Sequence, residues 1–200
     1  MKQSYGIMIT KSVFGGMLIS LGGIAFLLSD LKIVGSILFS IGLLTIIYFQ
    51  QLLFTGALCK DIGSLSVVQY IVIYLGNCLG TIIVASIMKF TRLYNVLYEK
   101  VSPIVSIKSN DSFISLFILG ILCEVCIYIA VVAKSRCESL SPLFIIFGVT
   151  IFVFCGFEHC IADCFYIFLA DTGYSIMIPV TLGNIFCGLG LSCIRKLMSE

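Results

Sequence analysis

Six long apolar runs, separated by polar segments, dominate the sequence. They lie near residues 12–29, 33–58, 67–88, 113–133, 140–170 and 174–194. A helix needs about 20 apolar residues to cross roughly 30 Å of hydrocarbon, and in lipid a helix satisfies its own backbone hydrogen bonds. The pattern predicts an all-α membrane protein with six transmembrane helices in a single membrane domain, residues 1–200. The connections are short except for residues 89–111.

The composition excludes several other classes of protein. Hydrophobic residues make up 60% of the chain and charged residues 11%, too little charge to cover the surface of a soluble globule. A net charge of +2 gives no reason to expect nucleic acid as a partner. The lipid bilayer is the expected surrounding. No nucleophile with a base, phosphate loop or cofactor motif occurs, so we expect neither an enzyme nor a bound cofactor.

Most of the ten cysteines lie inside the apolar runs. There a free thiol packs as a small apolar group, and we expect no disulfides. Cys123, Cys126, Cys155, Cys160 and Cys164 with His159 are the ligand types that zinc prefers, so a metal site is the alternative interpretation. Because their spacing does not make them converge, we expect no metal.

Two of the runs contain polar groups where hydrocarbon would surround them. Residues 50–56 interrupt the second run, and residues 156–163 interrupt the fifth. Each interruption is followed in the next run by a Gly-Asn motif, at Asn77 and at Asn184. We therefore predict that the second and fifth helices are broken.

The same order of run, broken run and Gly-Asn run occurs twice, over about residues 12–90 and 112–196. An odd number of spans in each unit places the two copies in opposite orientations. This is the inverted-repeat plan of transporters and channels, in which paired interrupted helices mark the substrate path. Coincidence between two Gly-Asn motifs in a glycine-rich chain is the other interpretation.

Four ionisable residues fall inside the predicted spans, namely Glu124, Glu158, His159 and Asp163. Such groups are costly in lipid and usually face a cavity or a partner. His159 is the only histidine, and it sits at the second break. There the end of a half-helix can direct backbone donors at an anion, and the imidazole can donate a hydrogen bond or a proton.

The distribution of Lys and Arg favours one orientation. With the N-terminus inside, seven of these residues, including Lys2, fall on the cytoplasmic side and five on the opposite side. Positive residues accumulate on the cytoplasmic side of membrane proteins. We expect a multi-pass protein of the cell membrane with both termini in the cytoplasm.

Four segments, in order, resemble one known family. They are residues 53–56 (Leu-Phe-Thr-Gly), residues 74–80, residues 156–159 (Gly-Phe-Glu-His) with Ile-Ala at 161–162, and residues 178–185. From about Val13 to Ile194 the chain resembles the formate/nitrite transporter family. These are pentameric channels for small monovalent anions, and they include hydrosulfide channels.

The resemblance implies roles for individual residues. The central pore histidine of the family matches His159, with Glu158 beside it, and the threonine of its flexible loop matches Thr55. The lysine that gives the vestibule a positive field matches Lys108. The constrictions match Phe39 and Leu43 on one side and Phe152 on the other. The asparagine of the last Gly-Asn motif matches Asn184, and Asn77 occupies the earlier motif.

The resemblance also implies a mechanism. Lys108 concentrates an anion, but a bare charge loses hydration in an apolar constriction. A weak acid protonated near His159 would pass Phe39, Leu43 or Phe152 as a neutral molecule. We expect a homo-oligomer, with pentamer as the family's state, whose solute is a small monovalent anion or its weak acid.

Two acidic residues depart from the family pattern. Glu124 and Asp163 stand where the family usually carries asparagine, and we expect both, with Asn77 and Asn184, to line the pore. If burial keeps these carboxyl groups protonated they can donate hydrogen bonds or relay protons, which asparagine cannot. We therefore expect a strongly proton-linked pore. A non-transporting sensor or scaffold, and a pore repurposed for protons or cations, are the alternatives.

Overall fold

The computed structural model describes residues 4–198, all of them in helices and connections without a β-strand. The predicted all-helical class is confirmed. The single domain expected to begin at residue 1 and end at residue 200, and the orientation argument that counts Lys2, both extend into residues outside the described range.

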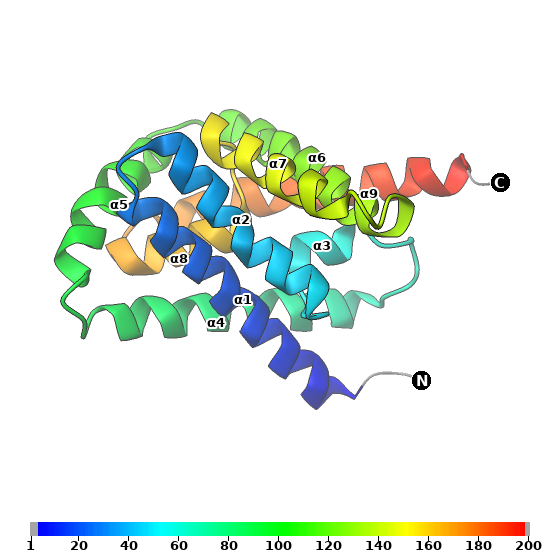
Figure 1. Ribbon diagram of the computed structural model, residues 1–200, viewed down its shortest axis with the longest axis horizontal. Helices are drawn as coiled ribbons and strands as arrows, with labels where there is room; N and C mark the ends of the chain where they lie inside the picture. The colour runs from blue at the N-terminus through cyan, green and yellow to red at the C-terminus, as the bar shows by residue number, and fades with distance from the viewer. Residues whose placement is uncertain (1–3, 199–200) are drawn as a thin grey trace.

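The helices follow the predicted runs (Figure 1). In chain order they are α1 (Tyr5–Leu28), α2 (Lys32–Tyr48), α3 (Phe54–Leu58), α4 (Val67–Met88), α5 (Tyr94–Ser109), α6 (Phe113–Arg136), α7 (Ser141–Cys155), α8 (Cys160–Ala170), the 3-10 turn η1 (Tyr174–Ile176) and α9 (Met177–Leu197).

Four helical segments in the described part of the chain are long and apolar enough to span a membrane. They are α1, α4, α6 and the segment Tyr174–Leu197, and α7 with α8 forms a fifth candidate that is bent by 49°. α2 has 17 residues, which is short for a complete span. The six-span layout therefore stays a prediction.

Both predicted breaks are present. α2 ends before Gln50, whose φ of 53° is left-handed, and the chain runs extended into α3. α7 ends at Gly156, with φ of 75°, a backbone conformation that a glycine adopts without strain. The short helices α3 and α8 leave these breaks toward opposite sides of the molecule (Figure 1). Almost every residue of α8 is buried, so this helix lies in the centre of the fold.

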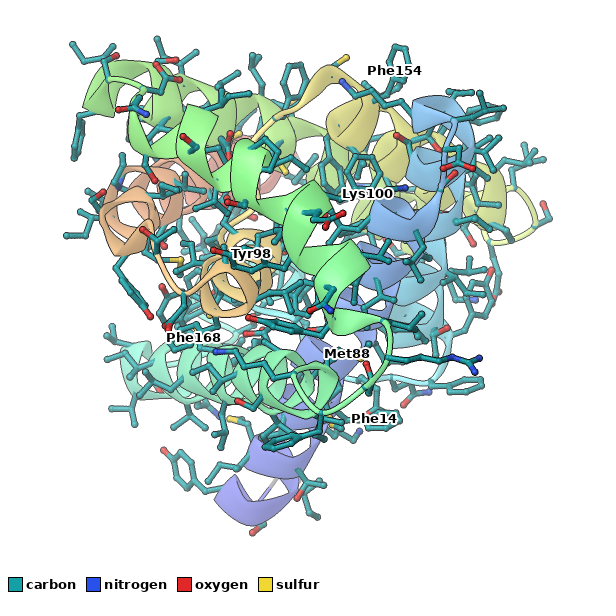
Figure 2. The ribbon with its side chains drawn as sticks, turned by 90° about the vertical axis from the view of Figure 1, so that its left-hand side faces the viewer. Phe14, Met88, Tyr98, Lys100, Phe154 and Phe168 are labelled. Carbon is teal, nitrogen blue, oxygen red and sulfur yellow. The ribbon has the colours of Figure 1, made fainter. Side chains whose placement is uncertain are left out.

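The long polar connection contains a helix that the sequence analysis did not predict. Leu97, Val101 and Val105 are fully buried, and their spacing of four residues gives α5 one apolar face. That face packs against α8. Figure 2 views the molecule from the side on which α5 lies, with Tyr98 and Lys100 labelled. α5 matters to the site because its last turn carries Lys108.

Glycines allow the close packing of α1 with α4 and of α6 with α9. A Cβ at Gly16 would collide with the backbone of Asn77, and one at Gly80 would collide with that of Val13. A Cβ at Gly183 would similarly meet the backbone of Phe117. Because helices in a membrane associate mainly through packing, small residues at these crossings hold the two pairs together.

Large apolar side chains cover the outside of the molecule. Leu75, Ile114 and Phe186 are each more than half exposed. An apolar outer surface of this extent suits contact with lipid or with other subunits rather than with water.

We expect Gly16→Ala to lower the stability of the protein in detergent by about 1–3 kcal/mol, the usual range for overpacking. The added methyl group has no space, because the backbone of α4 lies against this position. Gly190→Ala is the matched control, since no atom lies within 4 Å of its Cβ position. Thermal unfolding followed by circular dichroism should separate the two variants, and equal midpoints would contradict the packing argument.

Candidate functional site

Asn77 on α4 holds the first break in place. Its Oδ1 accepts a hydrogen bond from the backbone N–H of Phe54, at 2.7 Å. Its Nδ2 donates to the carbonyl of Ser12, at 2.6 Å, and to that of Leu52, at 2.8 Å. The side chain is fully buried. One amide thus satisfies three backbone groups, two of them at the interruption, where the helix leaves such groups without helical partners.

Asn184 on α9 makes the same three bonds at the second break. Its Oδ1 accepts from the N–H of Cys160, at 3.0 Å. Its Nδ2 donates to the carbonyls of Gly120, at 2.8 Å, and Glu158, at 3.1 Å. In both halves the amide bonds the first residue of the short helix and the carbonyl two residues earlier. Both amides are therefore engaged with the backbone.

His159 is the N-cap residue of α8 and lies between two hydrogen-bond partners. Its Nδ1 accepts from the N–H of Ala162, at 3.2 Å, and its Nε2 lies 3.0 Å from Oγ1 of Thr55. A backbone N–H can only donate, so Nδ1 carries no proton. The neutral ring then has its proton on Nε2 and donates it to Thr55. The hydroxyl hydrogen of Thr55 remains free to donate elsewhere.

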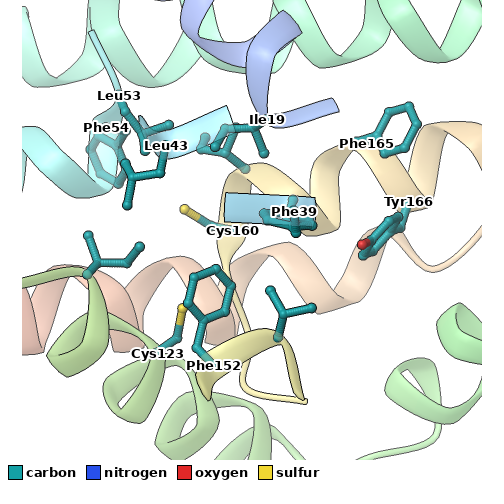
Figure 3. Packing of buried hydrophobic residues seen from close by; sticks show 14 of the residues in the cluster. Ile19, Phe39, Leu43, Leu53, Phe54, Cys123, Phe152, Cys160, Phe165 and Tyr166 are labelled. Carbon is teal, nitrogen blue, oxygen red and sulfur yellow. The ribbon is translucent and has the colours of Figure 1, made fainter. Parts of the chain in front are cut away.

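An apolar barrier adjoins this pair, and Figure 3 shows its members Phe39, Leu43 and Phe152 among the buried apolar side chains. The rings of Phe39 and Phe152 meet edge to face at 6.0 Å, and Phe152 stacks on the imidazole of His159 at 5.7 Å. Phe39, Leu43 and Phe152 are each at most 2% exposed. The structure thus places Phe39 and Phe152, expected in two separate constrictions, in contact with each other beside His159. Leu43 lies one turn further along α2 from Phe39.

Cavities lie on both sides of the barrier. One, of about 320 Å³, is lined by Phe39, Phe152 and His159 and contains Lys108; we call it the Lys108 chamber. The other, of about 370 Å³, is lined by Leu43 and contains Lys60; we call it the Lys60 chamber. The barrier residues therefore lie between two cavities that each contain a lysine.

Three charged side chains meet in the Lys108 chamber. The ammonium of Lys108 bonds both Oε2 of Glu158 and Oδ1 of Asp163. The two carboxyl groups are nearly inaccessible, with side-chain exposures of 4% and 1%. The field of the lysine is therefore compensated by acids when both are ionised. This arrangement differs from the uncompensated positive field that the resemblance implied for Lys108.

The Lys60 chamber carries positive charge that the sequence analysis used only to assign orientation. Lys11 and Lys60 both line it, and among the described residues around it there is no Asp or Glu. Burial, and then the neighbouring charge of Lys11, lower the pKa of Lys60 below its ordinary value. In the sequence, Lys11 and Lys60 each lie at the end of an apolar run. Their spacing along the chain does not show that they share a cavity.

Glu124 lies apart from both chambers. It is fully buried on α6, its Oε1 accepts a hydrogen bond from Sγ of Cys59 at 3.3 Å, and its Oε2 has no partner in the described part of the chain. Glu124, Asn77 and Asn184 do not line either chamber. Their predicted place along the pore stays a prediction.

The cysteines that suggested zinc do not form a metal site in the structure. Within residues 4–198 no group of three or more His, Cys, Asp or Glu side chains is placed to hold a metal ion. All ten cysteines are present as free thiols.

Comparison with known proteins assigns the chain. A sequence model described as formate/nitrite transporter matches residues 1–196. The chain belongs to the formate/nitrite transporter family. As a member it is a multi-pass membrane protein, and the family and its structural neighbours are channels and transporters rather than enzymes.

Individual relatives agree with this assignment. The "Formate channel FocA" of Haemophilus influenzae is 27% identical over 199 residues, covering 78% of this chain and 70% of that protein. An "Uncharacterized transporter YHL008C" of Saccharomyces cerevisiae is 26% identical over 144 residues, covering 64% of this chain and 23% of that protein.

Two solved structures share the fold. A "Pentameric formate channel with formate bound" superposes with a TM-score of 0.85 at 24% identity, covering 97% of this chain and 96% of that one. An "FNT family ion channel" superposes with a TM-score of 0.82, also at 24% identity, covering 96% and 90%. The described helices therefore have the arrangement of this channel fold.

We expect Asn184→Ala to destabilise the protein by at least about 2 kcal/mol, because unsatisfied buried polar groups cost about 1–3 kcal/mol each. Three backbone groups around the second break would lose their partner. Asn110→Ala is the control, since its amide bonds a single carbonyl at an exposed helix end. Thermal unfolding in detergent measures both, and comparable small losses would contradict the proposed structural role of Asn184.

Proposed function

We propose that the protein is a channel for small monovalent anions or their weak acids, of the formate, nitrite and hydrosulfide class, with proton-linked passage. The observation that carries the proposal is the His159–Thr55 pair at an apolar barrier between two chambers that each contain lysine. Family membership and the formate channels among the relatives support it.

The barrier explains why the proton matters. A bare anion between Phe39 and Phe152 would lose hydration worth several kcal/mol or more. The hydroxyl hydrogen of Thr55, left free because Thr55 accepts from Nε2–H of His159, supplies a hydrogen bond at this point but no full charge. A protonated, neutral acid therefore crosses at much lower cost than its anion, and narrow apolar walls exclude larger solutes. His159 and Lys108 together govern the step at which the anion is neutralised.

The proposal extends to architecture and assembly. We infer six spans arranged as an inverted repeat over about residues 12–90 and 112–196, because Asn77 and Asn184 make equivalent bonds in the two halves. We also infer a homopentamer, supported by the pentameric neighbour and the apolar outer surface. Cytoplasmic termini in the cell membrane would place the Lys60 chamber on the cytoplasmic side.

Replacing His159 tests the proposed function directly. We expect both His159→Ala and His159→Asn to reduce formate uptake into proteoliposomes at least tenfold, on the order of the contribution of one positioned proton or hydrogen-bond donor, since each removes the Nε2–H. The asparagine variant retains a side-chain oxygen that can cap α8, so it separates transport from loss of the cap. Uptake that is unchanged at every pH from about 5 to 8, where histidine ordinarily titrates, would refute the role of His159.

Opening the barrier should relax selectivity for size. We expect Phe152→Ala to admit lactate and acetate at rates nearer to that of formate, because the ring fills the space between Phe39 and His159. Phe147→Ala removes the same ring from an exposed position on α7 and should leave the ratio unchanged. Stopped-flow uptake of the three acids provides the ratio. Equal ratios in both variants would place the barrier elsewhere.

A non-transporting sensor is the second candidate, and the sealed barrier favours it. Phe39, Leu43 and Phe152 fill the space between the chambers in this structure. A closed channel has the same geometry, so uptake decides between the two. Absence of flux for every small anion by the assembled protein would leave the sensor as the better assignment.

A further inference from the structure

Lys108, the one lysine bonded to the two acids of its chamber, cannot neutralise both of them. One ammonium bonds two carboxyl groups, so the buried trio of Lys108, Glu158 and Asp163 carries one net negative charge when both acids are ionised. Burying an uncompensated charge is costly. Two carboxyl groups that share one site ordinarily hold a proton between them, and that proton belongs to the pair rather than to one residue. A single bound proton makes the trio neutral.

Asp163 has an oxygen that no neighbour satisfies. Its Oδ1 bonds Lys108, whereas its buried Oδ2 has no hydrogen-bond partner in residues 4–198. The residue is 1% exposed and lines the Lys108 chamber. A buried acceptor without a donor is unfavourable. A proton on Oδ2 makes this oxygen a hydrogen-bond donor. An anion in the chamber can accept that hydrogen bond.

No other group near Asp163 supplies the positive charge that would neutralise the second carboxylate. The remaining titratable neighbours are Lys32, Cys123, His159, Cys160, Cys164 and Tyr166. Thiols and phenols are ordinarily uncharged near neutral pH, and His159 is held neutral by its two hydrogen bonds. Lys32 also lines the chamber, but it is exposed, so water and salt screen its charge.

We propose that the Glu158–Asp163 pair takes up the proton that neutralises the transported anion, and that this proton passes from Oδ2 of Asp163 to the anion. The O–H bond of Asp163 breaks as an O–H bond forms on the anion. Asp163 is left as a carboxylate paired with Lys108, and the next proton comes from bulk solution. This inference rests on the proposed function and deepens it.

The hydrogen bonds of His159 agree with a proton donor other than the imidazole. Its Nδ1 accepts from a backbone N–H, and its Nε2 proton is engaged with Thr55. The imidazole therefore orients the solute at the barrier, whereas the carboxyl pair supplies the proton. The solute must then be the conjugate base of a weak acid. A permanently ionised anion such as nitrate cannot accept the proton.

Asp163→Asn separates binding of the anion from its protonation. In the unmodified protein, loading of the pair precedes binding of the anion, so the apparent KM for formate should rise by up to about tenfold per pH unit above the loading range. In the Asp163→Asn variant, the ammonium of Lys108 and the carboxylate of Glu158 have zero net charge, so no bound proton is needed. We expect the KM of this variant to stay constant within about threefold over the same range, while the maximal rate falls substantially because the donor is missing.

Two further variants complete the experiment in proteoliposomes. Asp163→Glu keeps a protonatable group and should retain the pH-dependent KM. Asp171→Asn makes the same chemical change at the exposed end of α8, where the left-handed backbone suits asparagine, and should match the unmodified protein. If KM rises in parallel with pH in the unmodified and Asp163→Asn proteins, formic acid enters already protonated from bulk solution and the proposal is wrong.

Infrared spectroscopy tests the proposal even if Asp163→Asn fails to assemble. Adding 13C-labelled formate to the unmodified, assembled protein should remove the carbonyl band of one unlabelled carboxyl group of the protein while an isotope-shifted band of formic acid forms, and an unchanged protein band would overturn the proposal. Failure of the unmodified protein to take up formate, nitrite or hydrosulfide at any pH would instead refute the proposed function. The two failures are therefore distinguishable.

Discussion

Two asparagine side chains make the interrupted helices of this protein possible. Hydrocarbon offers no partner for the backbone groups that a broken helix exposes, and each unsatisfied group costs several kcal/mol. Asn77 and Asn184 each bond three backbone groups at or beside a break from a neighbouring helix. With the breaks held in this way, the chain can place Thr55 and His159 at the starts of two short helices in the centre of the molecule.

The chemistry of the site follows from what surrounds these breaks. The apolar barrier of Phe39, Leu43 and Phe152 makes charge the quantity that decides passage, because a charged solute cannot keep its hydration there. The chambers on either side differ in charge. One has lysines without acids among its described lining, and the other has a lysine matched against two carboxyl groups. The two ends of the proposed path therefore differ in their balance of lysine and acid.

Much of this organisation could be predicted from the sequence. The apolar runs identify a helical membrane protein, and polar residues within two of them identify the breaks. The family motifs then point to His159, Thr55 and the constriction residues, which the structure brings together. α5 was missed because its charged residues and the internal Pro103 obscure the apolar face of Leu97, Val101 and Val105. Its burial depends on α8, which is distant in sequence.

The sequence alone establishes that this protein lies in a membrane and where its helices are interrupted. Both follow from composition and from residues a few positions apart. Only the folded structure determines which charged side chains contact one another. Lys108 lies fifty residues or more before the two acids that it bonds, and Lys11 shares a cavity with Lys60 through packing of separate helices. Electrostatic energy depends on distance in space and on burial, and neither is encoded in sequence spacing.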